Sequence, residues 1–273
     1  MLKQRIISAL IIATIIISVI FLLPQNFLIY FLAAITCLSF WEFHKVRFSN
    51  LLTLFALFVF ILLLFIAQFS FFNNLFLILS VLVYLSSSIF MLSFPLNKNF
   101  IKNGITWSLV GFLVHLGFYA AILQILSADH SVSFSSGSLN DRIFILFIVL
   151  ISVLMDSLAF FAGKTFGVRP FIANVSPNKT LEGFLFAIII SPTLLLLFSS
   201  SVFGMSLTTL FILLFSVCLM SVIGDGFASM MKRAIGVKDY SNLIPGHGGI
   251  FDRLDSHMAA FPFFILFLNL MIE

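Results

Sequence analysis

Long apolar stretches recur along the whole chain and are separated by short polar connections. A helix needs roughly 20 apolar residues to cross a hydrocarbon core of about 30 Å, and these stretches reach that length. Only 9% of the residues are charged, whereas an average soluble domain has about 25%, so the chain has too little polar surface to cover a water-exposed globule. The sequence therefore predicts an all-α fold, a polytopic integral membrane helical bundle that forms one domain over residues 1–273.

About nine transmembrane helices are expected by this length criterion. Their predicted bounds are 6–23, 27–44, 51–69, 74–93, 105–126, 143–163, 182–200, 207–225 and 257–272. We interpret the first as a spanning helix rather than a signal peptide, because it ends at Pro24 without a small-residue cleavage site. Residues 1–140 are expected to supply packing and lipid-facing helices, and residues 141–273 to carry the chemistry.

The basic residues predict which side of the membrane each connection occupies. If the chain starts inside, nine spans place thirteen of the 14 lysine and arginine residues on that side and only Arg142 on the other. The positive-inside rule then puts the N-terminus in the cytoplasm and Glu273 on the far side of the cell (inner) membrane. Because the net charge of +4 is dispersed over these connections, nucleic acid is not an expected partner.

Carboxylates gather near the cytoplasmic ends of the later predicted spans, at Asp156, Glu182, Asp225, Asp252 and Asp255. An acidic residue at the centre of a membrane costs about 2.5–3.5 kcal/mol on insertion scales. Several carboxylates at one depth cannot all stay ionised unless cations compensate them, and hard divalent cations prefer oxygen ligands. The group therefore predicts a site for a divalent cation, whereas a single aspartate in a span is equally typical of hydrogen-bonded helix packing.

One helix face near the end of the eighth span carries Asp225, Ser229 and Lys232, which are spaced at i, i+4 and i+7, with Arg233 beside them. If the helix continues to about Ile235, it presents a carboxylate, a hydroxyl and a cation in a row. This array suits a metal-bound polyphosphate, because carboxylates hold the metal while basic side chains take phosphate oxygens. The alternative for Lys232 and Arg233 alone is an ordinary positive-inside anchor.

A glycine-rich turn, Pro245-Gly246-His247-Gly248-Gly249, follows this helix and precedes the last span. Glycines allow the backbone to come close to a ligand and to direct N–H groups at anionic oxygens. His247 can donate to a phosphate or shuttle a proton. Asp252 and Asp255 come directly afterwards, at i and i+3 on the opening turn of the last helix, where negative charge is favoured.

A second polar segment, Ser176 to Gly183, is interpreted as a loop that enters the seventh span. Thr180 is expected to cap that helix, with Glu182 in its first turn. Lys179 and Arg169 are suited to binding an anionic head group at the membrane interface. A purely structural cap and anchor is the alternative.

These residues together resemble the signature of the phosphatidate cytidylyltransferases, the CDP-diacylglycerol synthases. The resemblance is carried by Asp225, Ser229, Lys232-Arg233, Lys238-Asp239, Pro245-Gly246-His247-Gly248-Gly249 and Asp252-Arg253-x-Asp255, with Asp156 and Ser176–Gly183 matching a second region. The start of the chain and Trp41-Glu42-Phe43 resemble the family more loosely. Asn178, Lys164 and Phe160 depart from the family's usual Lys, Arg and Tyr, and these departures do not touch the acidic residues.

The resemblance implies transfer of a cytidylyl group from CTP to phosphatidic acid, with CDP-diacylglycerol and pyrophosphate as products and Mg²⁺ as cofactor. On this basis the expected catalytic residues are Asp225, Asp252, Lys232, His247 and Asp255, and the expected metal ligands are Asp225, Asp252 and Asp156. The expected substrate-binding residues are Ser176, Lys179, Thr180, Glu182, Ser229, Arg233, Gly246, Gly248, Gly249 and Arg253. A second ion such as K⁺ and a homodimer stay open, as do two other functions, cytidylyl transfer to another lipid phosphate and ion-coupled transport.

Overall fold

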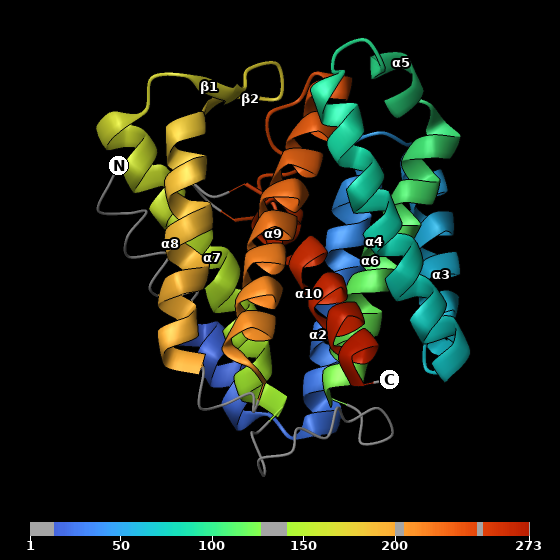
Figure 1. Cartoon of the computed structure of the whole chain (residues 1–273). Helices are drawn as coiled ribbons and strands as arrows, with labels where there is room; N and C mark the ends of the chain where they lie inside the picture. The colour runs from blue at the N-terminus through green and yellow to red at the C-terminus, as the bar shows by residue number, and fades with distance from the viewer. Residues whose placement is uncertain (1–13, 127–140, 200–204, 245–247, 273) are drawn as a thin grey trace.

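A computed structural model describes residues 14–126, 141–199, 205–244 and 248–272 as a bundle of long helices (Figure 1). Residues 14–22 are helical. They are followed by α2 (Gln25–Lys45), α3 (Asn50–Ile66), α4 (Ser70–Leu92), the short α5 (Lys98–Ile101), α6 (Gly104–Leu126), α7 (Asp141–Phe166), β1 (Pro170–Ile172), β2 (Ser176–Thr180), α8 (Leu181–Ser199), α9 (Leu207–Ile235) and α10 (Phe251–Ile272).

The apolar stretches of the sequence form the expected helices. Within the described residues, six helices are long and apolar enough to cross a membrane, and two shorter apolar helices cover 50–66 and 181–197. This confirms a polytopic membrane protein. Residues 6–13 of the first predicted span lie outside the described residues, so the count of nine stays a prediction.

The predicted all-α fold is wrong in one place. β1 and β2 form a two-stranded antiparallel hairpin in which Pro170 pairs with Thr180 and Ile172 with Ser176. The sequence predicts a loop in this part of the chain, because strands of three and five residues show no clear alternation of apolar and polar side chains. Pro177, which cannot donate to a ladder, is tolerated because both strands are edges.

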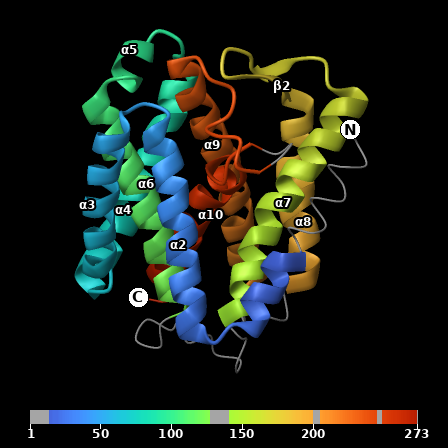
Figure 2. The ribbon, with the colours of Figure 1, turned by 180° about the vertical axis from the view of Figure 1, so that it is seen from behind.

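Helices α9 and α10 lie at the centre of the bundle (Figures 1 and 2). Helices α7 and α8 cover one side of them, and α2, α4 and α6 cover the other, with α3 outermost. One hydrophobic core joins the two halves of the sequence and includes Phe43 and Trp107 from the first half and Phe251 and Phe264 from the second. The protein is therefore held together by packing between both halves.

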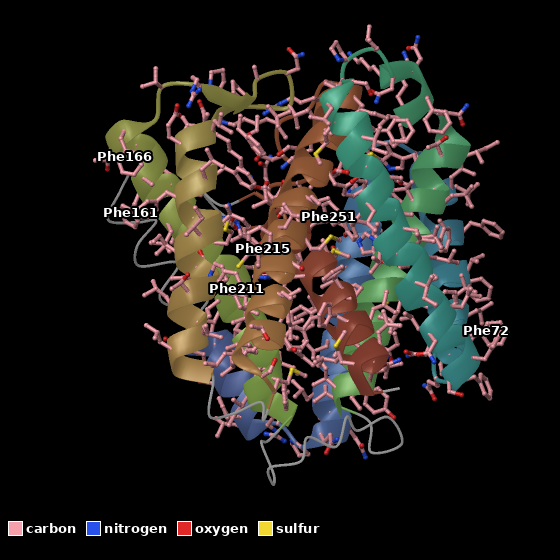
Figure 3. The ribbon with its side chains drawn as sticks, viewed as in Figure 1. Phe72, Phe161, Phe166, Phe211, Phe215 and Phe251 are labelled. Carbon is pink, nitrogen blue, oxygen red and sulfur yellow. The ribbon has the colours of Figure 1, made fainter. Side chains whose placement is uncertain are left out.

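Many large apolar side chains are exposed on the outer surface of the bundle, where we expect them to face lipid. Figure 3 shows Phe72 and Phe161 at opposite edges of the bundle and Phe251 in its middle, in line with exposed fractions of 40%, 65% and 0%. The hairpin and α5 lie at one end of the bundle, whereas the last turn of α10 lies toward the other (Figure 1). We refer to the first of these as the hairpin end.

The opposite end is held together by polar contacts between helices. Gln124 donates to Asn73 Oδ1 (2.8 Å) and to Asn74 Oδ1 (2.7 Å), and Asn269 donates to Gln124 Oε1 (2.9 Å). Arg142 donates to the carbonyls of Phe21 and Leu23 at the end of the first described helix. The one basic residue predicted on the far side thus caps a helix C-terminus, where cations are favoured.

Candidate active site

A pocket of about 200 Å³ lies between α7, α8, α9 and the hairpin. Its polar lining comprises Asp156, Lys179, Thr180 and Asp225. Its other walls are apolar and include the rings of Phe160, Phe171 and Phe184. Asp156, Lys179 and Asp225 were all predicted as site residues from separate parts of the sequence, and the fold brings them together here.

Lys179 on β2 forms an ion pair with Asp225 on α9, and this contact connects the hairpin to the central helix. Burial lowers the pKa of the Lys179 ammonium below its ordinary value, against the opposing effect of the Asp156 and Asp255 carboxylates. The carboxylates of Asp156 on α7 and Asp255 on α10 lie close enough to Lys179 to act on its charge. Four elements therefore contribute charged or polar groups to one region at the hairpin end.

Thr180 and Glu182 hold the hairpin against the start of α8. The Thr180 hydroxyl accepts from the Gly183 N–H at 3.2 Å, which confirms the predicted helix cap. Glu182 Oε2 accepts from the N–H groups of Val168 (3.0 Å) and Arg169 (3.1 Å), while its Oε1 accepts from Arg169 Nε (2.9 Å). Arg169 is thus engaged with Glu182, so its predicted role as a head-group ligand remains a prediction.

Helix α9 continues to Ile235, so the condition under which Asp225, Ser229 and Lys232 lie on one helix face is met. At its end, Lys232 Nζ lies 2.6 Å from Asp252 Oδ1, with side-chain exposed fractions of 11% and 5% for this pair. Arg233 donates to the carbonyl of Val237 at 3.1 Å and so helps to end the helix. Ser229 lies between Asp225 and Lys232 along the helix and is half-buried.

Asp252 also organises the segment that joins α9 to α10. Its Oδ2 accepts from the N–H groups of Tyr240 (2.9 Å) and Gly249 (3.0 Å). The Gly249 N–H is therefore directed at Asp252, not at a free anion position. Gly248 has a φ of 79°, a left-handed conformation that favours glycine, and a Cβ there would lie 3.0 Å from Asp252 Oδ2.

The other predicted residues are placed as follows. Asp255 lies in the first turns of α10, where its Oδ1 accepts from the Ser256 N–H at 2.9 Å, and Arg253 is exposed in the same turn. Ser176 begins β2 and is half-buried. Gly246 and His247 lie outside the described residues.

Glu42 belongs to this region but is absent from the site residues predicted from the sequence. It lies on α2 with 1% of its surface exposed and accepts hydrogen bonds from Ser241 Oγ (2.6 Å) and the Phe251 N–H (2.9 Å). One signal was available: Glu42 is the only acidic residue among the first 126 positions, and it falls inside a predicted span. A carboxylate retained at such a position predicts a polar partner.

The carboxylates offer the oxygen ligands that Mg²⁺ prefers. Within the described part of the chain, no three acidic, histidine or cysteine side chains converge on one point, and Lys179 and Lys232 each neutralise a carboxylate. Mg²⁺ is usually held by one or two carboxylates together with substrate phosphates, not by a closed protein cage. Asp156 and Asp225, which both line the pocket, therefore fit an ion that arrives with a polyphosphate.

Comparison with known proteins identifies the family. Residues 3–271 match the model of the cytidylyltransferase family. Phosphatidate cytidylyltransferases of Haemophilus influenzae and Bacillus subtilis are 31% and 29% identical, each over 98% of both chains. That of Helicobacter pylori strain J99 is 44% identical over 41% of this chain and 42% of its own length. With a match that spans nearly every residue, the chain belongs to the cytidylyltransferase family.

Proposed function

We infer that this chain is a phosphatidate cytidylyltransferase, which transfers the cytidylyl group of CTP to phosphatidic acid and forms CDP-diacylglycerol. Full-length similarity to enzymes of that name supports this function. The structural observation that carries it is the Lys179–Asp225 ion pair inside a phenylalanine-walled pocket. An anionic head group and its acyl chains need a charged end and an apolar wall in one site.

The lipid substrate is proposed to enter the pocket sideways from the membrane. Phe160 lines the pocket and is also 64% exposed on the outer surface of α7, so the apolar wall continues onto the lipid-facing side of the bundle. A lateral opening allows the acyl chains to stay in hydrocarbon while the phosphate reaches Lys179. The basic residues of the hairpin end favour a cytoplasmic location for that end.

The reaction requires two anions to approach each other. A phosphate oxygen of the lipid attacks the α-phosphorus of CTP, the bond from that phosphorus to the β-phosphate oxygen breaks, and pyrophosphate leaves. The attacking group is already ionised, because a phosphate monoester has a second pKa near about 6, so no strong general base is needed. Positioning and charge neutralisation are therefore the main tasks of the protein.

The proposed division of roles follows the placement of the charges. Asp225 and Asp252 would hold Mg²⁺, supported by Asp156 and Asp255. The ion supplies positive charge to the reacting phosphates. Contacts with phosphates are proposed for Lys232, Arg233, His247 and Arg253, and the glycines at 246, 248 and 249 would shape the turn. The lipid would be positioned by Ser176, Lys179 and Thr180, and Glu182 would order their hairpin.

Isosteric variants of the two proposed ligands test this assignment. Asp225→Asn and Asp252→Asn should each reduce cytidylyl transfer by at least about a hundredfold in membranes, as expected for loss of a group that stabilises transition-state charge. Asp141→Asn is the matched control, since it changes an acidic residue at the opposite end of α7. Near-normal turnover in both ligand variants, or full activity in excess chelator, would contradict the metal assignment.

A related enzyme acting on another lipid phosphate is the second candidate, because the charged residues recognise phosphates and not the rest of the lipid. The decisive comparison incubates the protein and labelled CTP with phosphatidic acid or with an isoprenoid ether-lipid phosphate. Ion-coupled transport, the remaining alternative, is not supported by the family.

A further inference from the structure

We propose that Glu42 is a positioning residue for the CTP-binding side of the site, acting on Ser241, Gly249 and Phe251 from the other half of the chain. This inference rests on the proposed function. Its basis is that two carboxylates accept hydrogen bonds from the described residues on both sides of the turn, Asp252 from Tyr240 and Gly249 and Glu42 from Ser241 and Phe251.

The first observation is that Glu42 uses both oxygens on this segment. Its Oε1 accepts from Ser241 Oγ at 2.6 Å, and its Oε2 accepts from the Phe251 N–H at 2.9 Å. Ser241 lies within the connection between α9 and α10, and Phe251 is the first residue of α10. A single side chain therefore links this connection to the start of the last helix.

The second observation is the close approach of the glycine-rich turn. A Cβ on Gly249 would lie 2.6 Å from Glu42 Oε2 and 2.9 Å from Ser241 Oγ, so the backbone rests directly against the carboxylate. The Ile244 N–H donates to the Gly248 carbonyl at 2.9 Å, which closes the base of the turn. The position of Gly249 thus depends on contacts with Glu42 as well as with Asp252.

The third observation is how the charge of Glu42 is compensated. None of the ion pairs among the described residues involves Glu42. Its partner is the N–H of Phe251, the first residue of α10, where the helix dipole favours an anion. The same turn of α10 carries Asp252, which pairs with Lys232. Glu42 therefore fixes the helix terminus that presents the proposed metal ligand.

The surroundings make this arrangement rigid. Phe43, the neighbour of Glu42, stacks on Trp107 at 4.7 Å and on Tyr240 at 5.7 Å between ring centroids. Tyr240 in turn contacts the ring of Phe251 at 4.6 Å. The pocket proposed to bind the lipid, which is lined by Asp156, Lys179 and Asp225, includes no residue of α2. A change at Glu42 should therefore alter the binding of CTP and leave the binding of the lipid unchanged.

The test compares Michaelis constants for the two substrates in purified full-length variants. Glu42→Ala should raise KM for CTP at least about tenfold, as expected for lost hydrogen bonds to a charged group, while KM for phosphatidate stays unchanged. Glu42→Gln should recover part of the loss, because its amide can accept from Phe251 and donate to Ser241. Thr36→Val, which changes a fully buried polar residue two turns earlier on α2, should behave like the unaltered protein.

An unchanged KM for CTP, or an equal rise in both Michaelis constants, would overturn the proposal. If Glu42→Ala does not fold, Ser241→Ala and Glu42→Gln carry the test, with an expected rise of roughly threefold in KM for CTP in Ser241→Ala. Failure of the unaltered protein to use phosphatidate would instead overturn the proposed function. In that event, weaker protection by Mg·CTP against thermal unfolding in Glu42→Ala still supports the positioning role, and equal protection contradicts it.

Discussion

Lys232 Nζ lies 2.6 Å from Asp252 Oδ1 and joins the end of α9 to the start of α10. The two residues are 20 positions apart, and the connection between them contains the glycine-rich turn. Asp252 also accepts the N–H groups of Tyr240 and Gly249, so one carboxylate anchors the helix end, the connection and the turn. Changes at this pair should affect both stability and chemistry.

Replacing Lys232 with methionine should abolish activity and destabilise the protein. Asp252 would remain buried without its cation, and breaking a buried pair by removing one partner costs about 3–5 kcal/mol. A thermal-unfolding series in detergent, together with turnover, measures both effects. Lys238→Met is the control, because Lys238 is an exposed lysine of the same connection. Equal unfolding temperatures and equal turnover for the two variants would refute this prediction.

Replacing Gly249 with alanine should displace the turn and raise KM for CTP. The new Cβ would meet the Glu42 carboxylate at 2.6 Å and the Ser241 hydroxyl at 2.9 Å, closer than side chains normally pack. Steady-state kinetics in both substrates would reveal the change. Gly104→Ala, whose Cβ would have its nearest neighbour at 3.4 Å, is the matched control and should have little effect.

The helices could be predicted from the sequence because the bilayer imposes their length, and the apolar stretches follow it. The continuation of α9 to Ile235 agrees with the helical spacing of the polar residues at 225, 229 and 232. The hairpin was missed because its short strands are defined by backbone pairing and not by a side-chain pattern. Glu42 was missed because its partners are 199 and 209 positions away, a separation that no local pattern encodes.

The alkaline limit of activity should depend on Lys179. Because burial lowers its pKa, this ammonium loses its proton at a lower pH than an ordinary lysine, whose pKa is 10.5. Activity should therefore fall as pH rises through that lowered value. Lys179→Arg should extend activity to higher pH, since a guanidinium stays protonated.

A pH–rate profile of kcat/KM for phosphatidate gives the measurement, with Lys164→Arg as control for an exposed lysine at the end of α7. The alkaline limb should move upward in Lys179→Arg and stay in place in Lys164→Arg. An alkaline limb unaffected by Lys179→Arg would show that another group controls it.

Replacing Gln124 with leucine should reduce stability without changing the chemistry. The change removes hydrogen bonds with Asn73, Asn74 and Asn269 at the end of the bundle opposite the hairpin end. Such interhelical contacts are worth roughly 0.6–2 kcal/mol in membranes. The unfolding temperature in detergent should drop while KM for both substrates is preserved, and Gln68→Leu, at an exposed position, should leave both unchanged.

The most direct measurement of the central claim follows the α-phosphate of CTP in purified protein reconstituted with phosphatidic acid. CTP labelled at that phosphate should transfer its label to the lipid, with one pyrophosphate released for each labelled lipid formed, and Asp225→Asn should abolish both. Release of pyrophosphate without labelled lipid, or label appearing only when a different lipid phosphate is supplied, would contradict the proposed function.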